Sequence, residues 1–207
     1  MIKNKEYIEK VKNMVDGAGK IACVITYGCQ QNENDSEKIK GYLYEMGYTL
    51  SEDSADADVI VFNTCAVRGG AEERVLGNVG ALKHRKEHNP DMIIGIMGCM
   101  TQQEAVSSHI MKKMKHVDFV MGTQALPRFP QILYKTLIEK KRVSDLEAND
   151  KIYEGSPIKR DDEIKASVSI MSGCNNFCTY CIVPYVRGRE RSREKENIIA
   201  EVKELKN

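Results

Sequence analysis

The chain has 207 residues, with 31 lysines and arginines against 30 aspartates and glutamates, a formal net charge of +1 and 42% hydrophobic residues. This length suits one well-formed core and part of another, and the balance of charge argues against a protein that coats DNA. The longest apolar run, around 92–100, is far shorter than the roughly 20 residues that cross a bilayer, so we expect a cytoplasmic protein with no membrane partner. In that compartment, seven cysteines indicate metal or redox chemistry rather than disulfides.

Strand-like and helix-like patterns alternate through the first two thirds of the chain. Helices are predicted from apolar residues at helical spacing, and strands from short apolar, β-branched runs. In chain order they are a helix at 3–16, a strand at 21–26, a helix at 34–46, strands at 48–50 and 59–62, a helix at 72–87, a strand at 92–97, a helix at 102–115, a strand at 119–121 and a helix at 129–140. This alternation predicts an α/β domain with a mainly parallel sheet over 1–142.

The pattern changes after this region. Residues 143–163 are charged and turn-rich, without clear periodicity, and are typical of an interdomain linker. Residues 165–171 then alternate as a strand, and 194–205 return to helical spacing. We therefore expect one β–α unit of a second, incomplete domain over 164–207.

Three cysteines follow that predicted strand, and we call Cys174, Cys178 and Cys181 the loop cysteines. Their loop is too short for useful disulfides within it, so we interpret the thiolates as ligands of one metal centre. A structural zinc ion would need a fourth ligand, and no histidine or further cysteine lies within a few residues. Three thiolates on a four-iron cluster leave one iron open to a small molecule. A zinc site or a plain structural role is the alternative.

Three other cysteines each follow a predicted strand, at intervals of about one β–α unit, and we call Cys29, Cys65 and Cys99 the edge cysteines. Ligands of open parallel sheets bind outside the carboxyl ends of the strands, so we expect these residues to converge. The glycines that precede Cys29 and Cys99 provide backbone freedom for a close approach to a cluster. The alternative is that all three are small buried hydrophobic residues. We favour that interpretation for Cys23, which lies in mid-strand.

Arginines alternate with other residues after the loop cysteines, at Arg187, Arg189, Arg191 and Arg193. In an extended segment all four would project from one face, where they would suit the phosphates of an RNA substrate. The alternatives are contacts with a small-molecule ligand, ion pairs with acidic neighbours such as Glu190, or a solvated charged loop.

Four stretches of the chain together carry a family resemblance. They are TYGCQ at 26–30, NTCAVR at 63–68, GCM at 98–100 and the long run at 173–193. The chain resembles the radical S-adenosylmethionine (SAM) methylthiotransferases, and among them the MiaB type. The resemblance implies a Rossmann-like N-terminal domain followed by the first β–α unit of a (βα)6 radical SAM barrel.

The resemblance also implies the cofactors. The edge cysteines would hold an auxiliary 4Fe–4S cluster and the loop cysteines the radical SAM 4Fe–4S cluster, with Tyr180 near the adenine of bound SAM. No side chain would act as a catalytic acid or base. Members of the family continue through the rest of the barrel to a β-rich RNA-binding domain. We therefore expect the chain to be the N-terminal portion of such an enzyme, inactive on its own.

The implied activity is insertion of a methylthio group at C2 of N6-dimethylallyl (isopentenyl) adenosine beside the tRNA anticodon. A 5′-deoxyadenosyl radical would remove the C2 hydrogen, the auxiliary cluster would hold the sulfur, and a flavodoxin-like or ferredoxin-like protein would donate electrons. One alternative is the sister activity on threonylcarbamoyl-adenosine in tRNA or on an aspartate of a ribosomal protein. An alternative of another class is a non-catalytic iron–sulfur or RNA-binding module.

Overall fold

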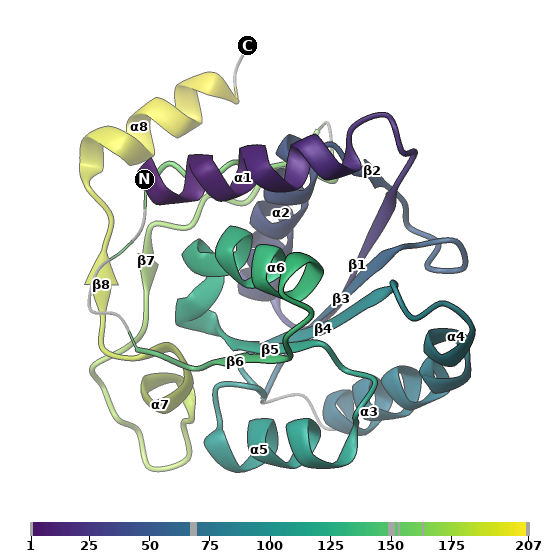
Figure 1. Cartoon of the computed structure of the whole chain (residues 1–207). Helices are drawn as coiled ribbons and strands as arrows, with labels where there is room; N and C mark the ends of the chain where they lie inside the picture. Colours follow the sequence, from purple (N-terminus) through teal and green to yellow (C-terminus); the bar gives the residue numbers. More distant parts are fainter. Residues whose placement is uncertain (1, 67–69, 149–151, 153, 163, 206–207) are drawn as a thin grey trace.

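The computed structural model describes residues 2–66, 70–148, 152, 154–162 and 164–205 (Figure 1). Val67 and Arg68 of the second motif, and parts of the expected linker, lie outside these ranges. The strands are β1 (Ile21–Tyr27), β2 (Thr49–Leu50), β3 (Val59–Thr64), β4 (Ile93–Gly98), β5 (Phe119–Gly122), β6 (Val143–Asp145), β7 (Met171–Ser172) and β8 (Arg191–Ser192). The helices are α1 (Ile2–Val15), α2 (Gln30–Glu45), α3 (Ala71–Ala81), α4 (Lys83–His88), α5 (Glu104–Lys113), the 3-10 helix η1 (Thr123–Arg128), α6 (Phe129–Ile138), α7 (Val183–Arg187) and α8 (Lys195–Glu204).

Strands β1 to β6 form one parallel sheet in the order β2-β1-β3-β4-β5-β6, which confirms the predicted α/β fold. Figure 1 shows α1, α2 and α6 on one face of the sheet and α3, α4 and α5 on the other. Every residue of β3 and β4 is buried, as expected for central strands that are covered on both faces. Val59 and Val61 of β3 pack into one core, and Ile60 and Phe62 into the other, because side chains alternate along a strand.

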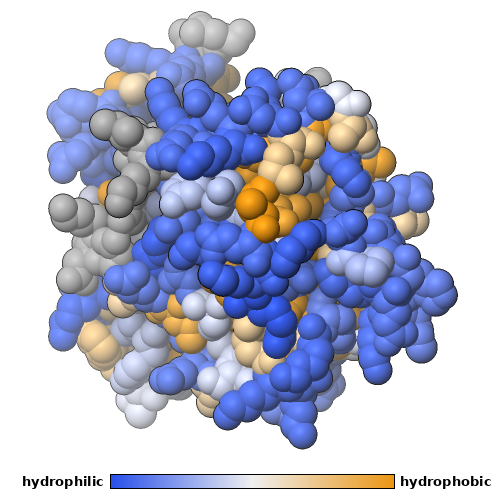
Figure 2. All heavy atoms as spheres, viewed as in Figure 1, coloured by the Kyte–Doolittle hydropathy of each residue, from blue (hydrophilic) through white to orange (hydrophobic). Residues whose placement is uncertain are grey.

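The apolar side chains lie mainly in these two cores. Phe119 and Phe129 are fully buried, and their rings meet edge to face with centroids 6.0 Å apart. Polar side chains cover most of the face seen in Figure 2, where apolar side chains form small separate areas. None of the described helices is long and apolar enough to cross a membrane.

One predicted helix is two helices in the structure. The helix expected at 72–87 is interrupted at Leu82, between α3 and α4. The Leu82 N–H donates to the carbonyl of Val79, three residues back, so the chain closes a tighter turn there than an α-helix has. Gly77 and Gly80 lower the helix propensity of the residues just before this turn.

The expected linker begins with a strand of the main sheet. Val143–Asp145 forms β6 and pairs with β5. The sequence pattern did not predict this strand, because three residues are too few to show a periodicity. Arg128 donates from Nε and Nη2 to the two carboxylate oxygens of Asp145, at 2.7 and 2.6 Å, and so ties β6 to η1. The expected division of the chain into domains stays a prediction.

Residues 154–162 of the expected linker lie against α2. The Lys159 N–H donates to the carbonyl of Glu37 at 3.0 Å. Arg160 then joins two helices, through ion pairs of 2.7 Å with Glu37 of α2 and 2.6 Å with Glu201 of α8. This segment therefore connects α8 to α2 through charged side chains.

The strand expected at 165–171 is wrong except at its last residue. Only Met171–Ser172 forms a strand, β7, and it pairs antiparallel with β8. Side chains bind the carbonyls before it: Asn34 Nδ2 donates to Ser167 at 3.1 Å, and Arg193 Nη1 donates to Ser169 at 2.8 Å. These side chains take the place of a neighbouring strand at two carbonyls of the segment.

Candidate metal centres

The edge cysteines lie at the carboxyl ends of three neighbouring strands. The Cys65 N–H donates to the carbonyl of Tyr27 at the end of β1, and the Cys99 N–H donates to the carbonyl of Thr64 at the end of β3, both at 2.9 Å. Cys29 follows β1 and is the N-cap residue of α2. The structure therefore puts all three at one edge of the sheet, while their role as metal ligands stays a prediction.

Cys29 begins the helix that carries much of the site. Its N–H and its thiol both contact Oδ1 of Asn32, at 3.2 and 3.3 Å. The free N–H groups and the dipole at the start of a helix favour negative charge. The first turn of α2 is therefore a suitable place for an anionic group beside Cys29.

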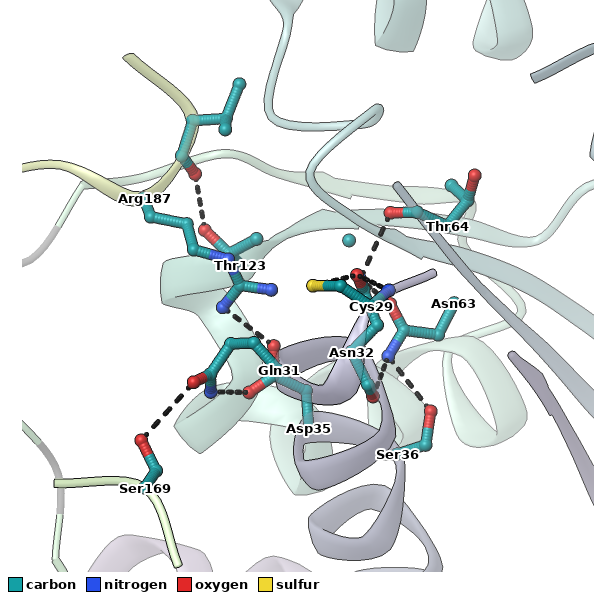
Figure 3. A network of polar contacts seen from close by, with 12 residues as sticks. Cys29, Gln31, Asn32, Asp35, Ser36, Asn63, Thr64, Thr123, Ser169 and Arg187 are labelled. Atoms are coloured by element: carbon teal, nitrogen blue, oxygen red, sulfur yellow. Dashed lines mark hydrogen bonds and ion pairs between the residues drawn. The ribbon is translucent and has the colours of Figure 1, made fainter. Parts of the chain in front are cut away.

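A buried amide pair joins the first turn of α2 to the end of β3 (Figure 3). Asn32 Nδ2 donates to Asn63 Oδ1 at 2.9 Å, and Asn63 Nδ2 donates to the Asn32 carbonyl at 2.8 Å and to Ser36 Oγ at 2.9 Å. The pair fixes the helix of Cys29 against the strand of Cys65. Sequence reasoning gave neither asparagine a role, and the available signal was a polar residue at the end of a wholly apolar strand.

The end of β4 approaches β3 closely just before Cys99. Gly98 has a φ of +114°, and a Cβ there would lie 2.2 Å from the carbonyl oxygen of Thr64, so only glycine fits. Cys65 and Cys99 are both buried. Burial raises the pKa of the Cys99 thiol, and the positive charge of nearby Arg187 acts in the opposite direction.

The loop cysteines lie in a loop that backbone contacts hold against the segment after α7. The Cys174 N–H donates to the carbonyl of Gly188 at 3.1 Å, and the Cys181 N–H to that of Cys178 at 2.9 Å. Gly173 has a φ of +82°, and a Cβ there would lie 2.1 Å from a carbonyl oxygen of the same segment. Cys178 is exposed and the other two loop cysteines are half-buried, so the loop is open to ligands.

Aromatic side chains surround this loop. Tyr180, which the resemblance puts near the SAM adenine, is 94% exposed, and its role stays a prediction. Phe177 packs edge to face on Tyr185, with ring centroids 6.0 Å apart, and the guanidinium of Arg189 lies 5.3 Å from the Phe177 centroid. Arg189 is thus held by a cation–π contact beside the loop cysteines.

The four arginines do not share one extended face, and that expectation was wrong. Arg187 is the last residue of α7, is buried, and forms a 2.9 Å ion pair with Asp35 of α2. Arg193 forms ion pairs with two glutamates, at 2.8 and 2.6 Å, and Arg191 donates to the Arg187 carbonyl at 2.8 Å. Carboxylates hold Arg187 and Arg193 inward, a carbonyl and an amide oxygen hold Arg191, and Arg189 is exposed. A role in RNA binding stays a prediction.

The donor chemistry fits iron–sulfur clusters. None of the seven cysteines, all of which lie within the described residues, is in a disulfide, and Cys23 of β1 packs in one of the two cores. Within the described residues, no three Cys, His, Asp or Glu side chains are grouped for a single ion. Ligands of one zinc ion lie about 2.3 Å from it, whereas the thiolates of a cluster bind different irons and lie further apart. Sulfur donors at a largely buried edge, beside the cation of Arg187, suit an anionic cluster.

Two family models match the chain. Residues 21–122 match the family described as uncharacterized protein family UPF0004, and residues 168–207 match the radical SAM superfamily. The first match includes the edge cysteines and the second includes the loop cysteines.

Curated relatives match nearly the whole chain. A tRNA-2-methylthio-N(6)-dimethylallyladenosine synthase of Caldicellulosiruptor saccharolyticus is 48% identical over 97% of this chain and 44% of its own length. Proteins of the same name from Clostridium perfringens and Clostridioides difficile are each 50% identical, over 90% and 98% of this chain and 42% and 41% of their own lengths. The chain thus spans less than half the length of these relatives. By these matches, residues 21–122 carry the UPF0004 match, residues 168–207 carry the radical SAM match, and nearly the whole chain is similar to the amino-terminal portion of these methylthio-adenosine synthases.

Proposed function

We propose that this chain carries the two iron–sulfur centres of a tRNA methylthiotransferase that acts at C2 of N6-dimethylallyladenosine beside the anticodon. The observation that carries the proposal is the placement of two sets of three thiols. The edge cysteines end three adjacent strands, and the loop cysteines are followed by α7, whose Arg187 contacts the same edge. The names of the relatives support the substrate.

The edge cysteines would hold one 4Fe–4S cluster and the loop cysteines the other. Bound at the loop cysteines, the second cluster and SAM would supply a 5′-deoxyadenosyl radical that can remove a hydrogen from an unactivated C–H bond. The C2 hydrogen of adenine is not acidic, so no base of the chain could remove it as a proton. A radical is therefore required for that step. The exposed ring of Tyr180 would contact SAM.

The side chains position the centres and control access to them. Burial of Cys65 and Cys99 keeps water from one side of the auxiliary centre, and the Asn32–Asn63 pair holds its strands and helix together. Exposure of Cys178 leaves the other centre open for SAM and for a substrate base. The chain therefore provides one shielded and one accessible sulfur site.

The remaining partners follow from the surface around the loop. Arg189 is exposed beside the loop cysteines and would contact tRNA phosphates. A flavodoxin-like or ferredoxin-like protein would donate electrons in the cytoplasm. The action on threonylcarbamoyl-adenosine or on a ribosomal protein becomes an outcome of the tests below.

Iron content after anaerobic reconstitution tests the two centres. We expect about eight irons per chain, and about four in each of two triple alanine variants, one of the edge cysteines and one of the loop cysteines. Cys23→Ala is the matched control and should keep the full iron content, because Cys23 lies in mid-strand. About four irons both in the unaltered chain and in the edge-cysteine variant would exclude the auxiliary centre and leave a one-cluster protein.

The substrate is tested with the complete protein. Purified full-length enzyme, SAM and a reductant should add a methylthio group to tRNA that carries N6-dimethylallyladenosine, as measured by nucleoside mass spectrometry. Modification of only threonylcarbamoyl-adenosine tRNA or of a ribosomal protein would favour the sister activity. Full iron content without any SAM cleavage would instead favour a non-catalytic iron–sulfur module.

A further inference from the structure

The guanidinium of Arg187 is a buried cation beside the edge cysteine Cys99. Arg187 ends α7, the helix that follows Cys181, and only 8% of the residue is exposed. Two hydrogen bonds fix the backbone there: Thr123 Oγ1 donates to the Val186 carbonyl at 2.6 Å, and Arg191 Nη2 donates to the Arg187 carbonyl at 2.8 Å. The end of α7 is therefore held at the carboxyl edge of the first sheet.

The neighbours of this guanidinium belong to the auxiliary site. Nη1 of Arg187 lies 2.9 Å from Oδ2 of Asp35, which is on the same helix that Cys29 begins. Its charge acts on the Cys99 thiol. Figure 3 shows the thiol of Cys29 pointing toward the side on which the guanidinium lies. The cation thus interacts with the sulfur of one edge cysteine, Cys99, and with the helix that another edge cysteine, Cys29, begins.

One nitrogen of the Arg187 guanidinium, Nη2, has hydrogen-bond donors available for an acceptor. This nitrogen is buried and makes no hydrogen bond of good geometry within the described residues, and the Cys99 thiol is the sulfur group with which the guanidinium interacts. A buried donor of a charged group normally has a partner, because losing its contact with water is costly. Asp35 pairs with Nη1, which leaves the Nη2 donors available to an anionic group at the edge cysteines.

We propose that Arg187 is a positioning residue for the auxiliary centre, where its Nη2 donates to a sulfur atom of a bound cluster and its charge favours uptake of one electron. Hydrogen bonds to sulfur and local charge are the means by which proteins set the reduction potential of such clusters. The electron comes from an external reductant, and no proton or bond is exchanged with Arg187. This inference rests on the proposed auxiliary centre.

The test is a redox titration of reconstituted protein with a chemical reductant. All variants carry alanine in place of the loop cysteines, so that only the auxiliary centre gives the electron paramagnetic resonance signal. Arg187→Gln removes the charge and should lower the ratio of reduced to oxidised centre about tenfold at a given potential, as expected for a unit charge in partly desolvated surroundings. For one electron this is a midpoint about 59 mV lower.

Three further variants separate charge from structure. Asp35→Asn removes the counter-charge and should raise the midpoint, so the proposal stays testable if Arg187→Gln does not fold. Arg187→Lys keeps the charge, so its midpoint potential should lie closer to that of the unaltered protein than the midpoint potential of Arg187→Gln does. Arg74→Gln, on the exposed face of α3, is the matched control and should leave the midpoint unchanged.

The outcomes distinguish this inference from the proposed function. A normal iron content with equal midpoints in the unaltered, Arg187→Gln and Asp35→Asn proteins would overturn the role of Arg187 and leave the auxiliary centre standing. Absence of iron from the edge cysteines would overturn both. A lower midpoint in Arg187→Gln with a higher one in Asp35→Asn would support the inference, because a purely structural defect would not shift the potential in opposite directions.

Discussion

Replacement of Asn63 by alanine removes the amide that joins the helix of Cys29 to the strand of Cys65. Asn63 is fully buried and its side chain takes part in three hydrogen bonds, with Asn32 Nδ2, the Asn32 carbonyl and Ser36 Oγ. Two of the groups that lose Asn63 keep another partner: Asn32 Nδ2 also donates to a carbonyl at 3.3 Å, and Ser36 Oγ lies 2.8 Å from a threonine hydroxyl.

The magnitude follows from these bonds. Since the partners are only partly orphaned, each lost bond costs about 1 kcal/mol rather than the full price of an unsatisfied buried group, which sums to about 3 kcal/mol. With a urea m-value of about 2 kcal/mol/M, the midpoint of unfolding should fall by about 1.5 M. The same change should reduce the iron bound at the edge cysteines, because α2 is no longer fixed against β3.

The assay is urea unfolding of the cluster-free chain, followed by far-UV circular dichroism, with iron content measured in parallel. Asn197→Ala on the exposed surface of α8 is the control and should change the free energy of unfolding by no more than about 0.5 kcal/mol. A midpoint within about 0.3 M of the unaltered chain, corresponding to about 0.6 kcal/mol, would refute the reasoning, since three buried bonds cannot be lost at so small a cost.

Three other perturbations have defined outcomes. Gly98→Ala forces a side chain into a φ of +114° and should lower stability by about 2 kcal/mol or more, seen as a thermal midpoint about 4–8 °C lower. Burial raises the pKa of Tyr48, so the folded chain keeps a proton that the unfolded chain loses near pH 10. The free energy of unfolding should therefore fall by up to about 1.4 kcal/mol per pH unit above about pH 10, and urea titrations of Tyr48→Phe should show a smaller fall. Arg160→Met leaves Glu37 and Glu201 without this partner and should cost about 1–3 kcal/mol after allowing for their partial exposure, detected as faster amide hydrogen exchange in α8.

Local pattern was sufficient wherever one element alone decides the outcome. The strands β1, β3, β4 and β5 are short apolar runs that can be recognised from the local sequence alone. Their apolar pattern therefore located them to within about two residues. The same pattern located the edge cysteines at strand ends. It failed for β6 and for 165–171, where pairing with a distant partner or capture of carbonyls by Asn34 and Arg193 decides the conformation.

The sequence by itself determined the parallel α/β architecture, the two sets of three cysteines and, through their motifs, the family resemblance. Only the tertiary structure decided that Arg187 is buried against Asp35 and that Asn32 and Asn63 lock the edge of the sheet. The physical reason is that a charged or amide side chain is buried only where a partner from another element compensates its lost hydration. Such partners are close in space and far apart along the chain, so no local pattern reports them.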